Sequence, residues 1–190
     1  MSFDLSEKEK NSIKESIKEL KNYQLVFSSE SITSFDSVLD FYSKLIDEDG
    51  IEVICIDYLQ LISNQSHSKS REFEIALFLR NLKSLAREKD IIFLITSQLN
   101  RSLELRGGDK RPILSDLRES GSIEEFADKV VFIYRPEYYQ FTYNEDGEST
   151  VGMIELIIAK NNNGKAGTVS LYSNENFTRF LENLTWLKQK

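Results

Sequence analysis

Histidine and cysteine are almost absent from this sequence, since each occurs once in 190 residues. A zinc site needs several such ligands, and a Ser-His-Asp triad needs a histidine held among partners, so neither is expected. The single histidine, His67, falls in the polar run of residues 63–68, which predicts a loop. The lone Cys55 lies in an apolar run, so we expect it to be buried as a small hydrophobe, and no internal disulfide is possible.

Proline and long apolar runs are scarce as well. Two prolines argue against long disordered linkers, and 190 residues fit one domain, 1–190, with a sizeable core. No apolar stretch approaches the roughly 18 residues of a membrane-spanning helix, and we find no signal peptide. We therefore expect a soluble cytoplasmic protein with no membrane partner.

Positive charge is in the minority, because the formal net charge is −7. An acidic chain binds nucleic acid through a local basic segment, so any such site must be concentrated. Residues 98–118 are the most basic stretch, and Gly107-Gly108 and Pro112 should block regular structure there. The cations of this basic segment are Arg101, Arg106, Lys110, Arg111 and Arg118.

The end of the basic segment supports one specific hypothesis. Arg118, Glu119 and Gly121 stand where a guanidinium and main-chain N–H groups can contact phosphate oxygens without reading bases. The alternative is a charge-rich loop that is simply solvated. No aromatic residues alternate with the cations, so base stacking is not indicated.

The sequence does contain an apolar run of strand length that begins at Ile51 and is broken by Asp57. Its β-branched residues predict a strand covered on both faces, with a carboxylate at its carboxyl end. Ligands bind at that edge of an open α/β sheet, and an acid there suits Mg²⁺ beside nucleotide phosphates. The alternative is a strand that merely ends in a polar residue.

A second buried strand is predicted over residues 91–97, after a helix over residues 70–89 that delivers it as a parallel neighbour. This alternation predicts an α/β fold. Gln98 would then lie beside Asp57, where its amide suits a phosphate oxygen or an attacking water. The alternative for Gln98 is a loop amide that caps nearby backbone.

The other elements are predicted from local signals. Ser6 and Glu9 have capping-box spacing at the start of the first helix, and Ser34 can cap the second. Turns are expected around Asn144 and Asn161, within a strand meander. The expected elements are helices over residues 6–23, 34–50 and 122–128, and strands over residues 23–27, 129–134, 154–159 and 168–172.

Five short groups of motifs follow one another along the chain. They are Asp57-Tyr58-Leu59-Gln60-Leu61, Ser97-Gln98-Leu99-Asn100-Arg101, Lys110-Arg111-Pro112 with Ser115-Asp116-Leu117-Arg118-Glu119-Ser120-Gly121-Ser122-Ile123-Glu124, Phe132-Ile133-Tyr134-Arg135, and Ala159-Lys160 with Asn163-Gly164. In this order and spacing they resemble the carboxyl-terminal motor domain of DnaB-type replicative helicases. The resemblance covers residues 5–180, nearly the whole chain.

The resemblance implies a RecA-like P-loop NTPase core, with a mostly parallel sheet flanked by helices and a C-terminal antiparallel strand meander. It implies a homo-oligomer, usually a hexameric ring around single-stranded DNA, that unwinds duplex DNA during replication alongside other replication proteins. Arg118, Glu119 and Gly121 resemble the loop that touches the DNA backbone in the central channel.

The resemblance also implies ATP and Mg²⁺ as ligands. Asp57 looks like the Walker B acid, which would hold Mg²⁺ through water, and Gln98 looks like the residue that senses the γ-phosphate. Arg101 belongs to the same expected nucleotide-binding set. Lys160 resembles a lysine that reaches across the subunit boundary into the neighbour's ATP site.

The chain departs from the family pattern at the phosphate cradle, G-x-x-x-x-G-K-[ST]. Its one Gly-Lys pair, Gly164-Lys165, is followed by Ala166 and has Ala159 where the first glycine belongs. The family's strand bearing the acid that activates water is missing too. In the RecA-like sheet the P-loop strand lies beside the strand that carries Gln98, so its loss should leave main-chain groups unpaired. We expect closure of that gap, pairing with another chain, or partial disorder.

A second departure is Asn162, which stands two residues after Lys160, where the family has an arginine finger. Such a finger neutralises charge that grows in the transition state, which an asparagine cannot do. Asn162 is expected to serve as a turn residue. We predict that this chain alone neither hydrolyses ATP nor unwinds DNA at a useful rate. The rival interpretation is a degenerate paralogue that serves as a DNA-binding or subunit-interaction module.

Overall fold

The computed structural model describes residues 5–28, 34–62, 70–118, 120–174 and 176–182. The loop predicted around His67 and the DNA contact predicted for Glu119 lie outside these described residues. The chain divides into two compact units, Met1–Ser31 and Ile32–Lys190, and each is described by itself.

The first unit contains α1, Glu7–Leu20, which begins where the capping-box spacing predicts. The Ser6 hydroxyl accepts the Glu9 N–H at 3.3 Å, and the Glu9 carboxylate accepts the Ser6 N–H at 2.8 Å. The Ser6 hydroxyl also donates to the Glu9 carboxylate at 2.7 Å, and this bond together with the one from the Ser6 N–H holds the pKa of Glu9 below its ordinary value. This reciprocal pair satisfies two N–H donors at the start of the helix. Because both partners lie within three residues of each other, the capping-box pattern can be recognised from local sequence alone.

The strand expected over residues 23–27 is absent, and that prediction was wrong. Residues 24–28 have no regular structure and are exposed, Phe27 by 87%. The prediction rested on apolar content alone. A strand is stabilised by a hydrogen-bonded neighbour, which local composition cannot supply.

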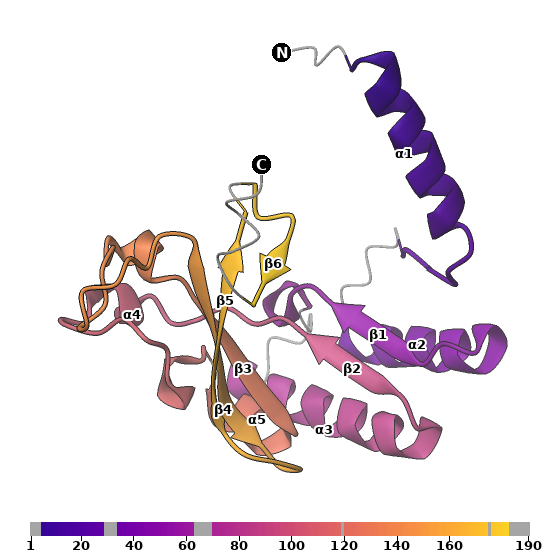
Figure 1. Ribbon diagram of the computed structural model, residues 1–190. Helices are drawn as coiled ribbons and strands as arrows, with labels where there is room; N and C mark the ends of the chain where they lie inside the picture. Colours follow the sequence, from indigo (N-terminus) through magenta and orange to yellow (C-terminus); the bar gives the residue numbers. More distant parts are fainter. Residues whose placement is uncertain (1–4, 29–33, 63–69, 119, 175, 183–190) are drawn as a thin grey trace. The chain divides into compact units, whose positions relative to one another are not determined.

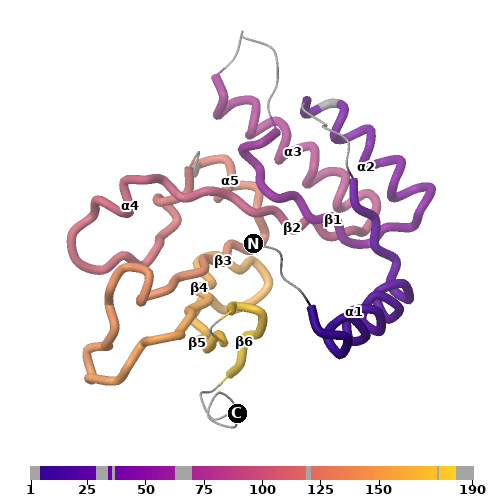
Figure 2. Tube along the Cα trace, turned by 90° about the horizontal axis from the view of Figure 1, so that it is seen from above, coloured from indigo at the N-terminus to yellow at the C-terminus, as the bar shows by residue number. Residues whose placement is uncertain are grey.

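The second unit opens with two helices and two strands. They are α2 (Phe35–Asp49), β1 (Val53–Ile56), α3 (Arg71–Lys89) and β2 (Ile92–Ile95). β1 and β2 are parallel neighbours in register, with Val53 opposite Ile92 and Ile56 opposite Ile95, which confirms the predicted strand-helix-strand unit. α2 and α3 lie side by side against one face of the pair (Figures 1 and 2).

The main core lies between these helices and strands. Phe35 of α2 stacks on Phe78 of α3 with 4.5 Å between the ring centres. Burying each large apolar side chain of this kind contributes about 1.5–3 kcal/mol, so the core fixes the strands against the helices. Its other buried members are Val38, Ile54, Ile56, Leu59, Ile62, Ile75, Leu79, Leu82 and Ile91.

The described chain covers only one face of the β1–β2 pair, although the apolar run predicted cover on both. On the other face Val53 is 50% exposed, and Ile92 and Leu94 of β2 are 63% and 60% exposed. Cys55 alternates with the buried residues of β1 and is exposed, so its predicted burial was wrong. Apolar content shows that a strand can be covered, but not which segment covers it.

The last third forms an antiparallel meander, as predicted. β3 (Lys129–Tyr134), β4 (Met153–Asn161), β5 (Gly167–Ser173) and β6 (Phe180–Leu181) are adjacent in that order. The helix expected over residues 122–128 is α5, Ser120–Phe126, and begins two residues earlier. Its Ile123 packs against both apolar clusters of the unit, so α5 joins the helical layer to the meander.

The strands of this unit form two separate sheets. β2 is at the edge of the parallel pair and β3 is at the edge of the antiparallel sheet, and the two do not pair within the described residues. Closure of the gap beside the Gln98 strand, one of the three expected outcomes, is therefore not found within the described residues. The described chain does not form one complete sheet, which would have contradicted the expected effect of losing the P-loop strand.

The basic segment, expected to be irregular, contains two single turns of helix. They are α4 (Ser102–Leu105) and the 3-10 turn η2 (Leu114–Asp116). Two further 3-10 turns, η1 (Leu59–Leu61) and η3 (Pro136–Tyr139), follow β1 and β3. None of the described helices is both long enough and apolar enough to cross a membrane.

Candidate functional site

The carboxyl ends of β1 and β2 bring two predicted site residues to one edge. Asp57 follows β1 directly, and Gln98 follows β2 after Thr96 and Ser97. Because the strands are parallel neighbours in register, their ends meet at the same edge of the sheet. The predicted placement is thus confirmed, while the roles of both residues stay predictions.

Asp57 is exposed, and its Oδ1 accepts a hydrogen bond from Thr96 Oγ1 at 2.5 Å. Sequence reasoning gave Thr96 no role, because the partner lies 39 residues away along the chain. No three His, Cys, Asp or Glu side chains gather into a metal cluster among the described residues. A single carboxylate fits Mg²⁺, which keeps several waters and takes other ligands from phosphates.

A third polar side chain at this edge, Gln60, was part of a motif but was not predicted as a site residue. Gln60 lies in η1, the turn after β1. Its Nε2 donates to Ser97 Oγ at 2.9 Å, and its Oε1 accepts the Gln98 N–H at 3.2 Å. One side chain therefore joins the loops that follow the two strands.

Several cations of the basic segment are engaged inside the chain. Arg106 Nη1 lies 2.9 Å from Asp116 Oδ2, and Asp116 also accepts the Ile113 N–H at 2.9 Å. Lys110 Nζ donates to the Glu104 carbonyl at 2.7 Å. These cations hold the segment in its folded path, a role that counting charges could not reveal.

Arg111 attaches the middle of the basic segment to the antiparallel sheet. Its Nη2 lies 2.5 Å from Glu155 Oε1 of β4, and its guanidinium carbon lies 5.8 Å from the ring centre of Tyr134. Glu155 is 3% exposed, and burial raises its pKa although Arg111 acts in the opposite direction. Burial also raises the pKa of Tyr134 to about 12.

Arg118 is exposed and lies beside the Gln98 loop. Its N–H donates to the Gln98 carbonyl at 3.3 Å, and Leu99 and Leu117 form an antiparallel bridge between the same two segments. Gly121 lies in α5, where an added Cβ would meet only the Glu72 carboxylate, at an ordinary 3.7 Å. The structure thus brings Arg118 to the Asp57 and Gln98 edge, with Gly121 three residues further along the chain.

Arg101, also exposed, stands at the start of α4. Lys160 of β4 donates from Nζ to the Glu124 carbonyl at 2.7 Å, so in this conformation it satisfies the end of α5. Asn162 lies in a turn, as expected, and its Nδ2 donates to Asp128 Oδ1 at 3.2 Å. Neither of these two contacts involves Asp57 or Gln98.

Asp128 is also paired with Lys83 of α3, and the hydrogen bond from Lys83 holds the pKa of Asp128 below its usual value. Asn162 therefore belongs to a small polar contact between α3 and the turn after β4. This contact supports the predicted turn role of Asn162.

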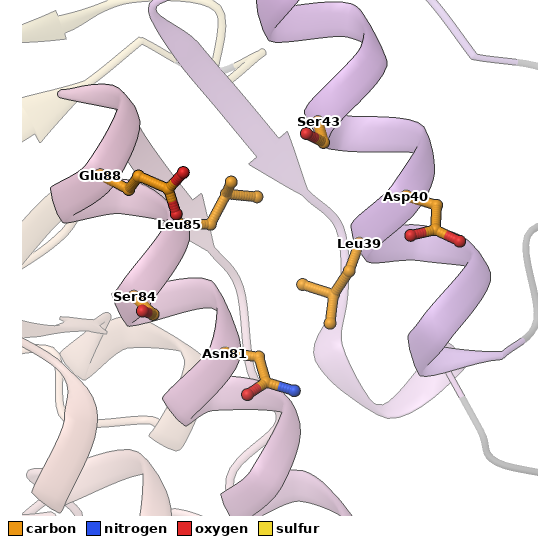
Figure 3. A pocket seen from close by; sticks show the side chains of 7 residues that line it. All are labelled: Leu39, Asp40, Ser43, Asn81, Ser84, Leu85 and Glu88. Carbon is orange, nitrogen blue, oxygen red and sulfur yellow. The ribbon is translucent and has the colours of Figure 1, made fainter.

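A shallow depression lies between α2 and α3, away from these residues (Figure 3). Leu39 and Leu85 lie on its two walls, and none of the predicted site residues lines it. Its remaining lining residues are Asp40, Ser43, Asn81, Ser84 and Glu88.

The chain is similar to known DnaB-type helicases. The model of the DnaB-like helicase C-terminal domain family matches residues 1–182. The replicative DNA helicase DnaB of Geobacillus stearothermophilus is 48% identical over 139 residues, which are 73% of this chain and 29% of that protein. The replicative DNA helicase DnaB of Haemophilus influenzae is 44% identical over 160 residues, 84% of this chain and 33% of that protein. The chain thus spans about a third of these curated relatives or less.

Two solved structures resemble the fold. One, described as an ATPase domain, matches with a TM-score of 0.79 at 32% identity, covering 94% of this chain and 61% of that chain. A DnaB-like replicative helicase, described with its interactions with primase, matches with a TM-score of 0.79 at 33% identity, covering 94% and 43%. These matches confirm the predicted RecA-like α/β fold.

Proposed function

The chain belongs to the DnaB-like helicase C-terminal domain family, and from this premise we propose that it is the carboxyl-terminal portion of a replicative helicase motor. In an intact ring, which we expect to be hexameric and cytoplasmic, the motor would couple ATP hydrolysis to movement along single-stranded DNA. The activity of the whole protein is part of this proposal, because the chain spans 29% and 33% of the two relatives above.

The observation that supports the proposal best is the shared edge of Asp57, Gln98 and Arg118. A carboxylate for Mg²⁺ and an amide for the γ-phosphate end neighbouring strands, and the Gln98 carbonyl accepts the Arg118 N–H at 3.3 Å. A nucleotide-facing loop and a DNA-facing loop are therefore in direct main-chain contact. Such a contact gives a physical route by which the two ligand sites can be coupled.

Each remaining residue receives a role consistent with its place. Mg²⁺ would neutralise phosphate charge, held by Asp57 through water. Arg101, exposed after the Gln98 loop, would add a positive charge beside the nucleotide. Lys160 would leave the Glu124 carbonyl and enter the ATP site of a neighbouring subunit. Arg118 with the start of α5, including Gly121, would follow the DNA backbone, and Glu119 belongs to this set by sequence.

We expect no DNA-stimulated ATP hydrolysis from the chain alone. The phosphate cradle is absent, and Asn162 donates to Asp128 where the family has an arginine finger. A phosphate-release assay with single-stranded DNA checks this, with an intact DnaB ring as the positive control. Turnover by this chain comparable to that of the ring would refute the prediction.

A second candidate function is a non-hydrolysing module that binds DNA or other subunits. The Asn162 contact with Asp128 favours it, because the residue is fitted into its own fold at the place where catalysis would need a cation. Genomic sequence upstream of the codon for Met1 separates the two. A P-loop in frame indicates a fragment of a motor, and a stop codon indicates a standalone module.

A further inference from the structure

Gln60, in the loop after β1, makes two side-chain hydrogen bonds to the loop after β2. Its neighbour Leu59 is 1% exposed in the main core, and the Leu59 N–H donates to the Thr96 carbonyl at 3.0 Å. η1 is therefore fixed against the end of β2 independently of the Gln60 side chain. Because the backbone of Gln60 is held in place, its side chain can hold the loop after β2.

The orientation of the Gln60 amide follows from the chemistry of its partners. The Gln98 N–H can only donate, so the amide oxygen of Gln60 must face it, at 3.2 Å. The amide nitrogen then faces Ser97 Oγ, at 2.9 Å, and donates to it. Both ends of the side chain are used, on two consecutive residues of the opposite loop.

The main chain of Gln98 is consequently held from two sides. Its N–H is bound by Gln60, and its carbonyl accepts the Arg118 N–H at 3.3 Å. The next residues continue the contact, since the Asn100 N–H donates to the Asp116 carbonyl at 2.7 Å. A displacement of Gln98 is therefore transmitted to the position of Arg118.

We propose that Gln60 is a positioning residue for the motor. It fixes the loop that carries Gln98 to the loop that carries Asp57, and through Gln98 it sets the position of Arg118. This inference rests on the proposed function, because it assumes that Arg118 contacts DNA. A merely structural role would instead lower global stability and leave the DNA contact unchanged in the folded chain.

The test replaces Gln60 with methionine, which has a similar shape and forms neither hydrogen bond. Leu61→Met is the matched control, because Leu61 is exposed in the same turn. We expect Gln60→Met to speed amide hydrogen exchange at Gln98 and Arg118 by about tenfold or more. The net stabilisation lost with the two hydrogen bonds of Gln60 corresponds to about that factor. Exchange in α3 should not change, and Leu61→Met should resemble the wild type.

The functional readout is the affinity for a fluorescently labelled oligothymidylate. We expect Gln60→Met to weaken binding several-fold while the salt dependence is kept, because the charge of Arg118 is still present. Ser97→Ala, which removes only one of the two bonds, should lie between the wild type and Gln60→Met.

Unchanged exchange and unchanged affinity in a folded Gln60→Met chain would overturn the inference. Its failure is separable from that of the proposed function. If Arg118→Ala weakens binding and Gln60→Met does not, the positioning role is wrong and the DNA contact stands. If Arg118→Ala has no effect on binding, the DNA contact itself is wrong.

Discussion

At the scale of single residues, the cations near the proposed DNA contact differ in what they can still bind. Arg118 is exposed, whereas the Arg106 side chain is 32% exposed and paired with an Asp116 side chain that is 10% exposed. Binding to phosphates releases counterions, so only a cation that reaches a phosphate contributes to the salt dependence of affinity. The two arginines should therefore behave differently on substitution.

We expect Arg118→Ala to weaken binding of single-stranded DNA and to reduce its salt dependence. Loss of one phosphate contact lowers the slope of log affinity against log salt by about 0.7 for a single strand. Titrations of labelled oligothymidylate at several salt concentrations measure this slope. An unchanged slope and affinity would remove Arg118 from the site.

Arg106→Ala serves as the matched substitution within the same segment. It should leave the slope unchanged but destabilise the fold by about 1–3 kcal/mol, since Asp116 loses a charged partner in a largely buried position. Urea unfolding measures the stability, and binding is compared at the same salt concentrations. A reduced slope with unchanged stability would show that Arg106 contacts DNA instead.

At the scale of elements, the basic segment depends on a sheet that follows it in the chain. Glu155 of β4 binds Arg111, 44 residues earlier, and its Oε2 is buried without a hydrogen-bond partner among the described residues. Burial raises the pKa of Glu155, so the folded chain holds this proton more tightly than the unfolded chain does. The attachment of the segment to β4 is therefore sensitive to pH.

We expect the stability difference between Glu155→Gln and the wild type to depend on pH. Stability from the Glu155 proton is fully present below the ordinary pKa of 4.5 and is lost as pH rises through the raised folded value. The glutamine does not titrate, so the difference should move in favour of the variant over that window and then level off.

Urea unfolding at a series of pH values measures this difference. Glu145→Gln is the control for the substitution itself, because Glu145 is exposed in a turn. A constant difference for Glu155→Gln, or one that moves in favour of the wild type as pH rises, would contradict the expectation.

The elements also show which parts of the site a sequence can reveal. The capping serines predicted at positions 6 and 34 mark helix starts correctly, because a cap involves only residues three apart. Asp57 and Gln98 were found because strand ends can be located from apolar runs. Gln60 and Thr96 were missed as site residues because their partners lie 37–39 residues away, and no local pattern encodes such pairs.

At the scale of the whole molecule, one sheet face in the unit Ile32–Lys190 is exposed. The sequence did not predict this, because no local pattern shows which distant segment covers a strand. The run around Asp57 correctly predicted a strand, but the cover that it predicted on both faces is not found within the described residues. The described chain supplies helices for one side only, and Val53, Ile92 and Leu94 remain at least half exposed on the other. Where a soluble protein exposes a large apolar patch, the patch commonly marks a site of association.

We expect the purified chain to self-associate through this sheet face, because in a pure solution the available apolar partner is a second copy of the chain. β2 also has an unpaired edge among the described strands, which favours the contact. Replacing both Ile92 and Leu94 with lysine should shift the chain toward the monomer in sedimentation velocity at matched concentrations. Leu105→Lys is the control, because Leu105 is 88% exposed but lies in α4 rather than on a strand.

Cys55 provides an independent measurement of the same association, since it is exposed on β1 and alternates with the buried residues there. Its thiol should react with a maleimide rapidly in dilute native chain and more slowly as concentration rises, because association covers the face. The lysine double variant should lose this concentration dependence, while Leu105→Lys keeps it. A wild-type chain that stays monomeric and labels at one rate across the whole concentration series would show that the open face does not pair with itself.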